Sequence, residues 1–182
     1  KYVFMSMTLH FTKEEFLSRE TKVKDSMVEK GLDALLIFRQ ESMYWLTGYD
    51  TFGYVFFQCL VLTSKGDKIL LTRSADLRQA QNTSIIKDIR IWKDKDNSNP
   101  AKELREILLG LNLENKSVGI EYDAYGLTGT NTMRLNKELD GFAKLSDASF
   151  IITKLRLIKS DQEIKYIKKA AELGDKALKK SW

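Results

Sequence analysis

The sequence predicts an α/β fold in which a mixed β-sheet is flanked by helices. Short continuous apolar runs, such as residues 33–38, have the pattern of strands buried on both faces, and they alternate with amphipathic helical segments. A turn sequence at residues 64–67 joins two apolar runs and predicts a hairpin, which supplies the antiparallel part of the sheet. With 182 residues, 43% of them hydrophobic, the chain can bury one sizeable core.

The first half of the chain supplies helices and strands in alternation. Thr12 and Glu15 form a capping box that opens an amphipathic helix, and Gly31 supplies its stop signal. The strands of this half are expected at residues 33–38, 54–63, 68–72 and 89–92. A short helix near residues 76–81 precedes the last of these strands.

The second half repeats the alternation. A polar loop ends at Pro100, a residue favoured at the first position of a helix. The expected elements are a helix at 100–109, a strand at 118–120, a helix at 128–139, a strand at 143–145 and a helix at 149–155. Helices interspersed with buried strands in this way predict an α/β sandwich.

The last helix begins at a second capping box, formed by Ser160 and Glu163, and runs on without a stop signal. We expect this helix to be cut, not finished. Its apolar and small residues recur at three- and four-residue steps, at Ile164, Ile167, Ala171, Gly174, Leu178 and Trp182. Because such a stripe is unfavourable in water, we expect it to pack on its own domain or on a second copy of the chain.

The net charge of +5 does not predict nucleic-acid binding, because of where the charge lies. Residues 1–150 carry 21 basic and 21 acidic side chains, whereas residues 151–182 carry 9 and 4, interleaved on a helix as in a solvated face. The lone cysteine, Cys59, lies in an apolar run and is interpreted as buried, which indicates a reducing compartment. No apolar run is long enough to cross a membrane. We expect a cytoplasmic protein that binds neither nucleic acid nor membrane.

Groups suited to catalysis or metal binding are scarce. His10 is the only histidine and has no carboxylate or cysteine at ligand spacing, so it is interpreted as a surface residue. Glu121 and Asp123 follow a predicted strand, but successive strand residues point to opposite faces and do not by themselves make a carboxylate pair. Asp123 is interpreted as a turn or cap residue. We therefore expect no catalytic residue, no metal ligand and no cofactor in this chain.

Residues 44–57 are the segment most suggestive of binding, because seven of the fourteen are aromatic and Gly48 and Gly53 interrupt any regular element. Rigid aromatic loops often line binding pockets. The functional candidates are Asp50, Thr51 and Phe52, at the tip of the loop. The residues interpreted as core are Tyr44, Trp45, Phe56 and Phe57.

Several of these segments, in this order and spacing, resemble the amino-terminal domain of the creatinase/prolidase family, which includes Xaa-Pro aminopeptidases. The matching segments are residues 31–36, 44–49, 118–121 and 155–164. The resemblance implies a ribonuclease H-like, non-catalytic α/β domain over residues 1–156. It also implies that residues 157–182 are the joint and first helix of a missing pita-bread domain. In that domain two Asp, one His and two Glu hold two divalent metal ions, manganese, cobalt or zinc.

The resemblance further implies a homodimer that acts on a peptide or small amide substrate. In creatinase-like members the loop after the Thr-Gly pair reaches the partner's pocket, which maps here onto the substrate-binding residues Asp50, Thr51, Phe52, Tyr54 and Phe56. Residues 72–78 depart from the Asp-x-Arg-Tyr pattern of many peptidase members, so a creatinase-like or cyclic-amide hydrolase is an alternative to an Xaa-Pro peptidase. A non-catalytic relative that binds peptides or proteins is a third.

Overall fold

A computed structural model describes residues 9–181, and these contain a six-stranded mixed sheet. The strands are β1 (Ala34–Ile37), β2 (Cys59–Thr63), β3 (Lys68–Arg73), β4 (Asp88–Trp92), β5 (Ser117–Ile120) and β6 (Lys144–Asp147). Their order across the sheet is β4-β3-β2-β1-β5-β6. The two pairings of β2, with β1 and β3, are antiparallel, and the other three pairings are parallel. The expected mixed α/β sheet is therefore confirmed.

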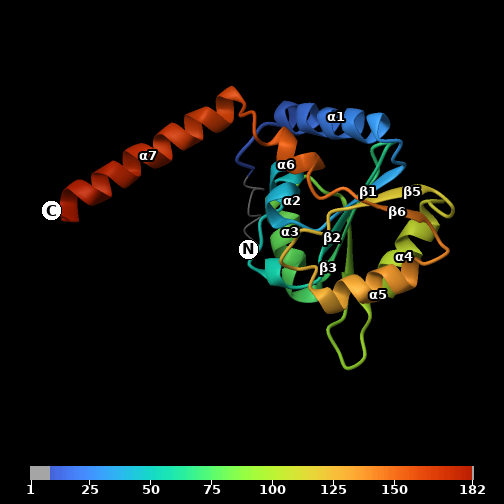
Figure 1. Cartoon of the computed structure of the whole chain (residues 1–182). Helices are drawn as coiled ribbons and strands as arrows, with labels where there is room; N and C mark the ends of the chain where they lie inside the picture. Colours follow the sequence, from blue (N-terminus) through green and yellow to red (C-terminus); the bar gives the residue numbers. More distant parts are fainter. Residues whose placement is uncertain (1–8, 182) are drawn as a thin grey trace, which may run out of the picture.

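Helices cover both faces of this sheet (Figure 1). They are α1 (Lys13–Glu29), α2 (Gln40–Thr47), α3 (Leu77–Thr83), α4 (Pro100–Gly110), α5 (Gly129–Leu139), α6 (Ile151–Leu155) and α7 (Asp161–Ser181), with short 3₁₀ turns η1 (Gly53–Val55) and η2 (Ser74–Asp76). Side chains of α4 and α5 pack in one apolar cluster, and side chains of α1, α2, α3 and α6 pack in another. The molecule thus has three layers, with the sheet in the middle.

Strand residues alternate between the two clusters, as the two-residue period of a strand requires. Leu36 belongs to the α4 and α5 side, whereas Leu35 and Ile37 belong to the other. Both faces of β1 are buried, which explains its continuous apolar sequence.

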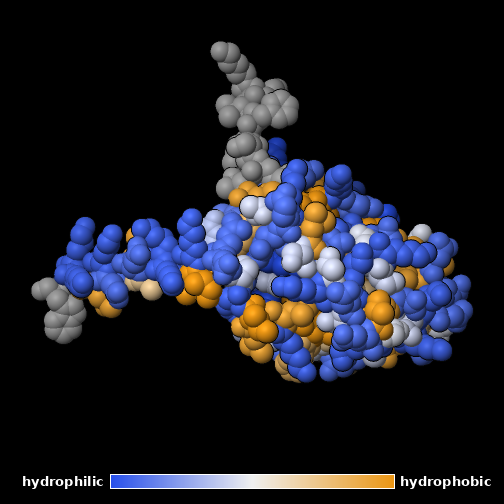
Figure 2. Space-filling model, turned by 90° about the horizontal axis from the view of Figure 1, so that it is seen from above, coloured by the Kyte–Doolittle hydropathy of each residue, from blue (hydrophilic) through white to orange (hydrophobic). Residues whose placement is uncertain are grey.

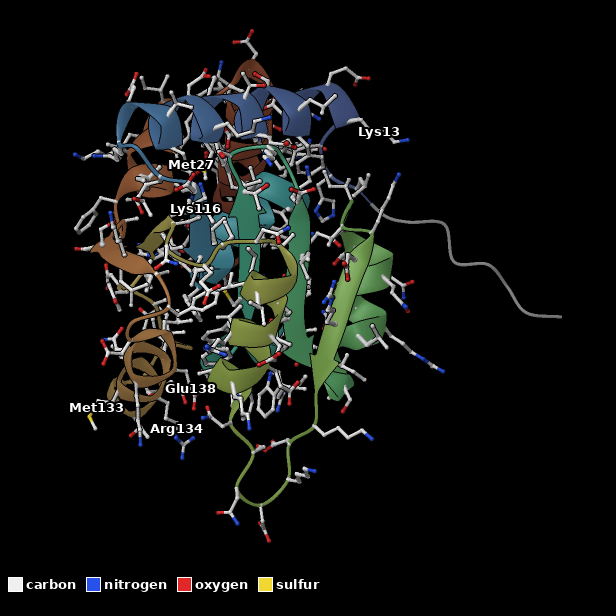
Figure 3. All side chains as sticks on the ribbon, turned by 90° about the vertical axis from the view of Figure 1, so that its right-hand side faces the viewer. Lys13, Met27, Lys116, Met133, Arg134 and Glu138 are labelled. Atoms are coloured by element: carbon white, nitrogen blue, oxygen red, sulfur yellow. The ribbon has the colours of Figure 1, made fainter. Side chains whose placement is uncertain are left out.

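The two helices on the first of these faces are also joined by a polar contact. Asn99 caps α4 by accepting from the Ala101 amide, and its Nδ2 donates to Glu138 of α5 at 2.8 Å. Figure 3 shows Met133 and Arg134 on the outer side of α5, where both are exposed. Polar links of this kind fix how neighbouring helices sit on the sheet.

The predicted helix starts are confirmed in detail. Thr12 Oγ1 accepts from the Glu15 amide at 3.2 Å at the start of α1. At the start of α7, the Glu163 amide donates to Ser160 Oγ at 3.2 Å, and the Ser160 amide donates to Glu163 Oε2 at 2.8 Å, which completes the reciprocal capping box.

One expectation about the elements is wrong. The strand predicted at residues 54–63 begins only at Cys59. Residues 53–55, just before it, form the 3₁₀ turn η1 and do not have an extended backbone. The apolar stripe of the last helix is not buried on its own domain, since α7 has no buried residue and projects from the body (Figure 1). Its packing on a second copy of the chain stays a prediction. Trp182, the last member of that stripe, lies outside the described residues.

Candidate functional site

The aromatic loop, residues 49–58, is held from inside by buried hydrogen bonds. The Thr51 hydroxyl donates to Asp76 Oδ1 at 2.8 Å, and the Gly53 amide donates to the same hydroxyl oxygen at 2.9 Å. The Tyr49 hydroxyl donates to Gln58 Oε1 at 2.7 Å, and burial raises the pKa of Tyr49 to about 12. Because these polar groups are buried and satisfied, the loop has one defined conformation.

The outer side of the same loop carries large apolar side chains into solvent. Phe52 is 89% exposed, and Tyr54, Val55 and Phe56 are each more than 40% exposed. The guanidinium of Arg73 lies 3.5 Å from the centre of the Phe56 ring. A rigid loop that exposes aromatic rings in this way is typical of a binding surface.

A second segment, after β5, packs against this loop. The rings of Tyr54 and Tyr125 meet edge to face, with their centroids 6.2 Å apart. Gly126 approaches the loop so closely that a Cβ there would lie 2.4 Å from the Phe56 carbonyl oxygen. Only glycine fits this position without moving the loop.

The structure places the five predicted substrate-binding residues in two groups. Asp50, Phe52, Tyr54 and Phe56 are exposed, whereas Thr51 is buried and its hydroxyl is engaged with Asp76. Thr51 therefore supports the loop from behind.

The residues interpreted as core also divide. Trp45 and Phe57 are buried, as predicted, and Tyr44 is half-buried. Phe56 is 42% exposed, so its interpretation as a core residue is wrong. Sequence alone did not separate them, because Phe56 and Phe57 are adjacent residues of the same type in one apolar run.

Glu121, at the end of β5, is a buried carboxylate whose role sequence reasoning missed. It is 2% exposed, and it accepts from the Phe38 and Arg39 amides and from the Ser42 hydroxyl at the start of α2. Burial raises its pKa to about 7, although these hydrogen bonds act in the opposite direction. Asp123 instead pairs with Arg39 on the surface, so the two carboxylates have separate partners.

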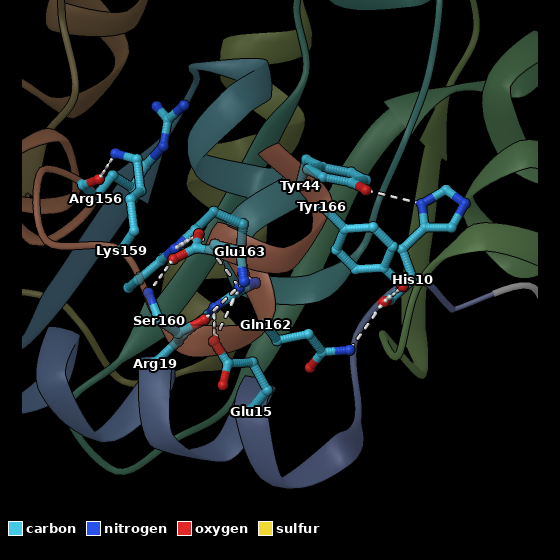
Figure 4. Close-up of polar contacts among 11 residues, drawn as sticks. His10, Glu15, Arg19, Tyr44, Arg156, Lys159, Ser160, Gln162, Glu163 and Tyr166 are labelled. Atoms are coloured by element: carbon cyan, nitrogen blue, oxygen red, sulfur yellow. Dashed lines mark hydrogen bonds and ion pairs between the residues drawn. The ribbon is translucent and has the colours of Figure 1, made fainter. Parts of the chain in front are cut away.

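The joint before α7 is fixed to the body by Glu163 (Figure 4). The Trp45 indole donates to Glu163 Oε1 at 3.0 Å, and Arg19 lies 3.3 Å from the same oxygen. The Arg19 side chain is only 2% exposed and also bonds Glu15 and the Trp45 carbonyl. This arrangement determines where α7 leaves the domain.

His10 lies in the same region, on the surface as predicted. Its Nδ1 is 2.8 Å from the Tyr44 hydroxyl, and its carbonyl accepts from the Tyr166 hydroxyl at 2.7 Å. A hollow of about 530 Å³ adjoins these groups, and Ile167 and Ala170 line it from α7. Figure 2 shows hydrophobic residues gathered on the body beside the base of the projecting helix.

Within residues 9–181, no three His, Cys, Asp or Glu side chains gather closely enough to hold a metal ion. No helix in the described range has the length and apolarity needed to cross a membrane.

Comparison with known proteins gives a match to one family model and several hydrolase and peptidase relatives. The model of the creatinase/prolidase N-terminal domain family matches residues 19–158. Ectoine hydrolase of Halomonas elongata is 31% identical over 93% of this chain, and Xaa-Pro dipeptidase of Pyrococcus horikoshii is 28% identical over 86%. The chain spans only 44% and 39% of the lengths of these two enzymes.

Solved structures agree with this. A dipeptidase from Pyrococcus horikoshii superposes with a TM-score of 0.72 and 26% identity, over 90% of this chain and 44% of that one. The N-terminal domain of the cytoplasmic peptidase PepQ from Mycobacterium tuberculosis, solved on its own, has the same fold at a TM-score of 0.59 and 20% identity, over 76% of this chain and 98% of that one. The family match and the fold together establish that this chain belongs to the creatinase/prolidase N-terminal domain family.

Proposed function

We propose that this chain is the non-catalytic amino-terminal domain of a dinuclear-metal hydrolase, and that it serves dimerisation and closure of the substrate pocket. The observation that carries the proposal is the aromatic loop, which is braced from within and exposes Phe52, Tyr54 and Phe56. The absence of a ligand cluster among residues 9–181 supports placing the two divalent metals in a separate catalytic domain. The protein acts in the cytoplasm, in keeping with its buried free Cys59.

In this proposal the loop of one subunit closes the pocket of the other. Exposed rings on a defined backbone lose little entropy on binding, which suits them to contact a substrate. Asp50 is exposed beside them and adds a charge to the same surface. The peptide or amide bond itself is hydrolysed by groups outside this domain.

The first candidate substrate is an Xaa-Pro peptide, which is what the Xaa-Pro dipeptidase relative acts on by name. The second is a small cyclic or guanidino amide. The ectoine hydrolase relative favours the second candidate, as does the departure of residues 72–78 from the peptidase pattern, since Arg73 and Asp76 of that segment contact the loop. A non-catalytic binding relative is the remaining alternative, and a full-length protein without turnover would favour it.

The test uses the full-length dimer and the variants Phe52→Ala and Tyr54→Ala. Loss of a pocket contact is worth about 1–3 kcal/mol, so the ratio of kcat/KM between an Xaa-Pro dipeptide and a cyclic amide should change by roughly tenfold or more. Met133→Ala, exposed on α5, is the matched control and should leave the ratio unchanged. Retention of the parent ratio in both loop variants would refute the proposal.

A hybrid dimer tests whether the loop acts across the interface. One subunit carries Phe52→Ala, and the other carries a substitution that inactivates its catalytic domain. The working catalytic centre then faces the unaltered loop of its neighbour, so we expect the parent's substrate ratio. A hybrid with the ratio of the Phe52→Ala homodimer would show that the loop serves its own subunit.

A further inference from the structure

A hollow beside the aromatic loop is lined by one carboxylate and two aromatic rings. It has a volume of about 530 Å³ and is lined by Gln40, Glu41, Tyr54, Val55 and Tyr125. Three segments form it: the first turn of α2, the aromatic loop, and the segment after β5. Because each segment is fixed by the contacts described above, the hollow is formed before any ligand enters.

The only charged side chain in the lining is the Glu41 carboxylate. Among the described residues, no basic group lies within ion-pair distance of it. Its neighbour Arg39 is already committed, because its guanidinium donates to the Asp123 carbonyl at 2.9 Å and pairs with the Asp123 carboxylate. The carboxylate therefore leaves a negative charge that a ligand can neutralise.

Several donors just before and within the first turn of α2 are already engaged. A helix N-terminus attracts anions through its unpaired N–H groups. Here Glu121 accepts from the amides of Phe38 and Arg39 and from the Ser42 hydroxyl, so these donors are already used by a buried carboxylate.

Gln40 forms one wall of the hollow. Its Nε2 donates to the Tyr49 carbonyl at 2.8 Å, which fixes the orientation of the amide. Its Oε1 is buried, and among the described residues it has no hydrogen-bond partner. Because this oxygen is buried, a ligand in the hollow does not reach it, and Gln40 contributes a fixed wall and no acceptor.

The two tyrosines supply aromatic surface. Tyr54 and Tyr125 stand edge to face at an interplanar angle of 77°, and both are exposed. Aromatic faces attract cations through the ring quadrupole, and they also pack against the apolar part of a ligand.

We propose that this hollow binds the positively charged group of a small substrate: an ammonium, amidinium or guanidinium. The charge meets Glu41, and the two tyrosine rings contact the rest of the group. An anion would be repelled by Glu41, and a neutral apolar group would leave its carboxylate without a partner. The inference rests on the proposed function for the identity of the ligand as a substrate, but binding itself does not require turnover.

The experiment titrates the 182-residue chain with n-butylammonium, n-butanol and butyrate at constant ionic strength and follows the backbone amides of Gln40, Glu41 and Gly126 by NMR. Butylammonium should shift these amides with saturation, and butyrate should not. Glu41→Gln and Tyr125→Ala should each weaken binding by about fivefold, the size expected for one ion pair or one cation–π contact at a partly exposed site. Glu103→Gln, an exposed carboxylate in the first turn of α4, is the matched control and should leave the affinity unchanged.

Three results would overturn the proposal. The first is equal binding of butanol and butylammonium, which would mean an apolar pocket. The second is an unchanged affinity in both the Glu41 and Tyr125 variants with intact spectra. The third is a butylammonium effect that is seen only in dilute monomer and vanishes where the chain self-associates, which would mean that a basic side chain of a second copy fills the hollow. None of these outcomes depends on the hybrid-dimer result, so the two proposals fail separately.

Discussion

The aromatic loop and α7 both expose large apolar side chains, but they are held in different ways. The loop is braced along its length by Thr51, Gln58 and Asp76, so its exposed rings stand on a fixed backbone. In contrast, α7 is fixed at its first turns, by Glu163 and Tyr166, and its remaining residues make no buried contact. Exposed apolar side chains therefore indicate different properties in the aromatic loop and in α7.

Exposed rings on a braced backbone are prepared to bind, because little order is lost when a ligand arrives. An apolar stripe on a helix held at one end is instead a largely exposed face. Ile167 lines the hollow beside His10 and is still 51% exposed, and Leu178, farther along the helix, is 63% exposed. The difference between the two regions lies in the buried groups behind them, and those groups can be altered one at a time.

The largest effect is expected at the anchor of α7. Arg19→Ala removes the buried partner of Glu15 and Glu163, and breaking such a pair typically costs about 3–5 kcal/mol of unfolding free energy. Urea denaturation followed by circular dichroism measures this. Lys169→Ala, which breaks the exposed pair with Glu172, is the control and should change the unfolding free energy by less than about 0.5 kcal/mol. A similar small change for Arg19→Ala would mean that α7 is not anchored by this cluster.

A pH-dependent effect is expected where Glu121 braces the start of α2. Its pKa is raised from 4.5 to about 7, so the folded state holds this proton more tightly than the unfolded state. The unfolding free energy should therefore fall as the pH rises from about 4.5 to about 7, by an amount on the order of 3 kcal/mol, and change little above that. The lowered pKa of Asp147 acts in the opposite sense, below its ordinary value of 3.8.

Glu121→Gln should remove this slope, because glutamine keeps the acceptor for the Phe38 and Arg39 amides and does not titrate. The measurement is urea denaturation at several pH values between about 4.5 and about 8, with Glu103→Gln as the matched surface control. If the slope is the same in all three proteins, another group is responsible.

The smallest effect is expected at the contact between the loop and the segment after β5. In Gly126→Ala the new Cβ would lie 2.4 Å from the Phe56 carbonyl oxygen, and the shift that follows should cost about 1–3 kcal/mol. Gly129→Ala, at the first residue of α5 with no atom within 4 Å, should be neutral or stabilising by up to about 1 kcal/mol. Thermal unfolding of the two variants compares them directly. Equal melting temperatures would show that the loop moves away from the new Cβ at little cost in free energy.

Much of the fold was predictable because its signals are local. The capping residues Thr12 and Ser160, Pro100 at the start of α4, and the turn at residues 64–67 each act on neighbours in the chain. The start of β2 was not predictable in this way. The apolar run before Cys59 continues the strand pattern, but the Gly53 amide donates to the Thr51 hydroxyl and the Gly53 carbonyl accepts from Gln58, and these bonds hold that backbone in a loop.

The site was only partly predictable, because its supports come from distant segments. The aromatic composition identified the loop, yet nothing near Thr51 in the sequence indicates that its hydroxyl meets Asp76, 25 positions away. Glu121 is 79 positions from Ser42, and Glu163 is 118 from Trp45. The stripe on α7 was recognised correctly as a pattern, but its surroundings depend on where the joint directs the helix.

The order of the strands has a consequence for how the chain folds. β1 to β4 are neighbours in both sequence and space, so their pairings close short loops. β1 meets β5 only through residues about 84 positions apart, such as Asp33 and Ser117, and pairing of that range forms more slowly. Until residues 117–120 arrive, the apolar β1 is an open sheet edge, available to any other strand that reaches it first.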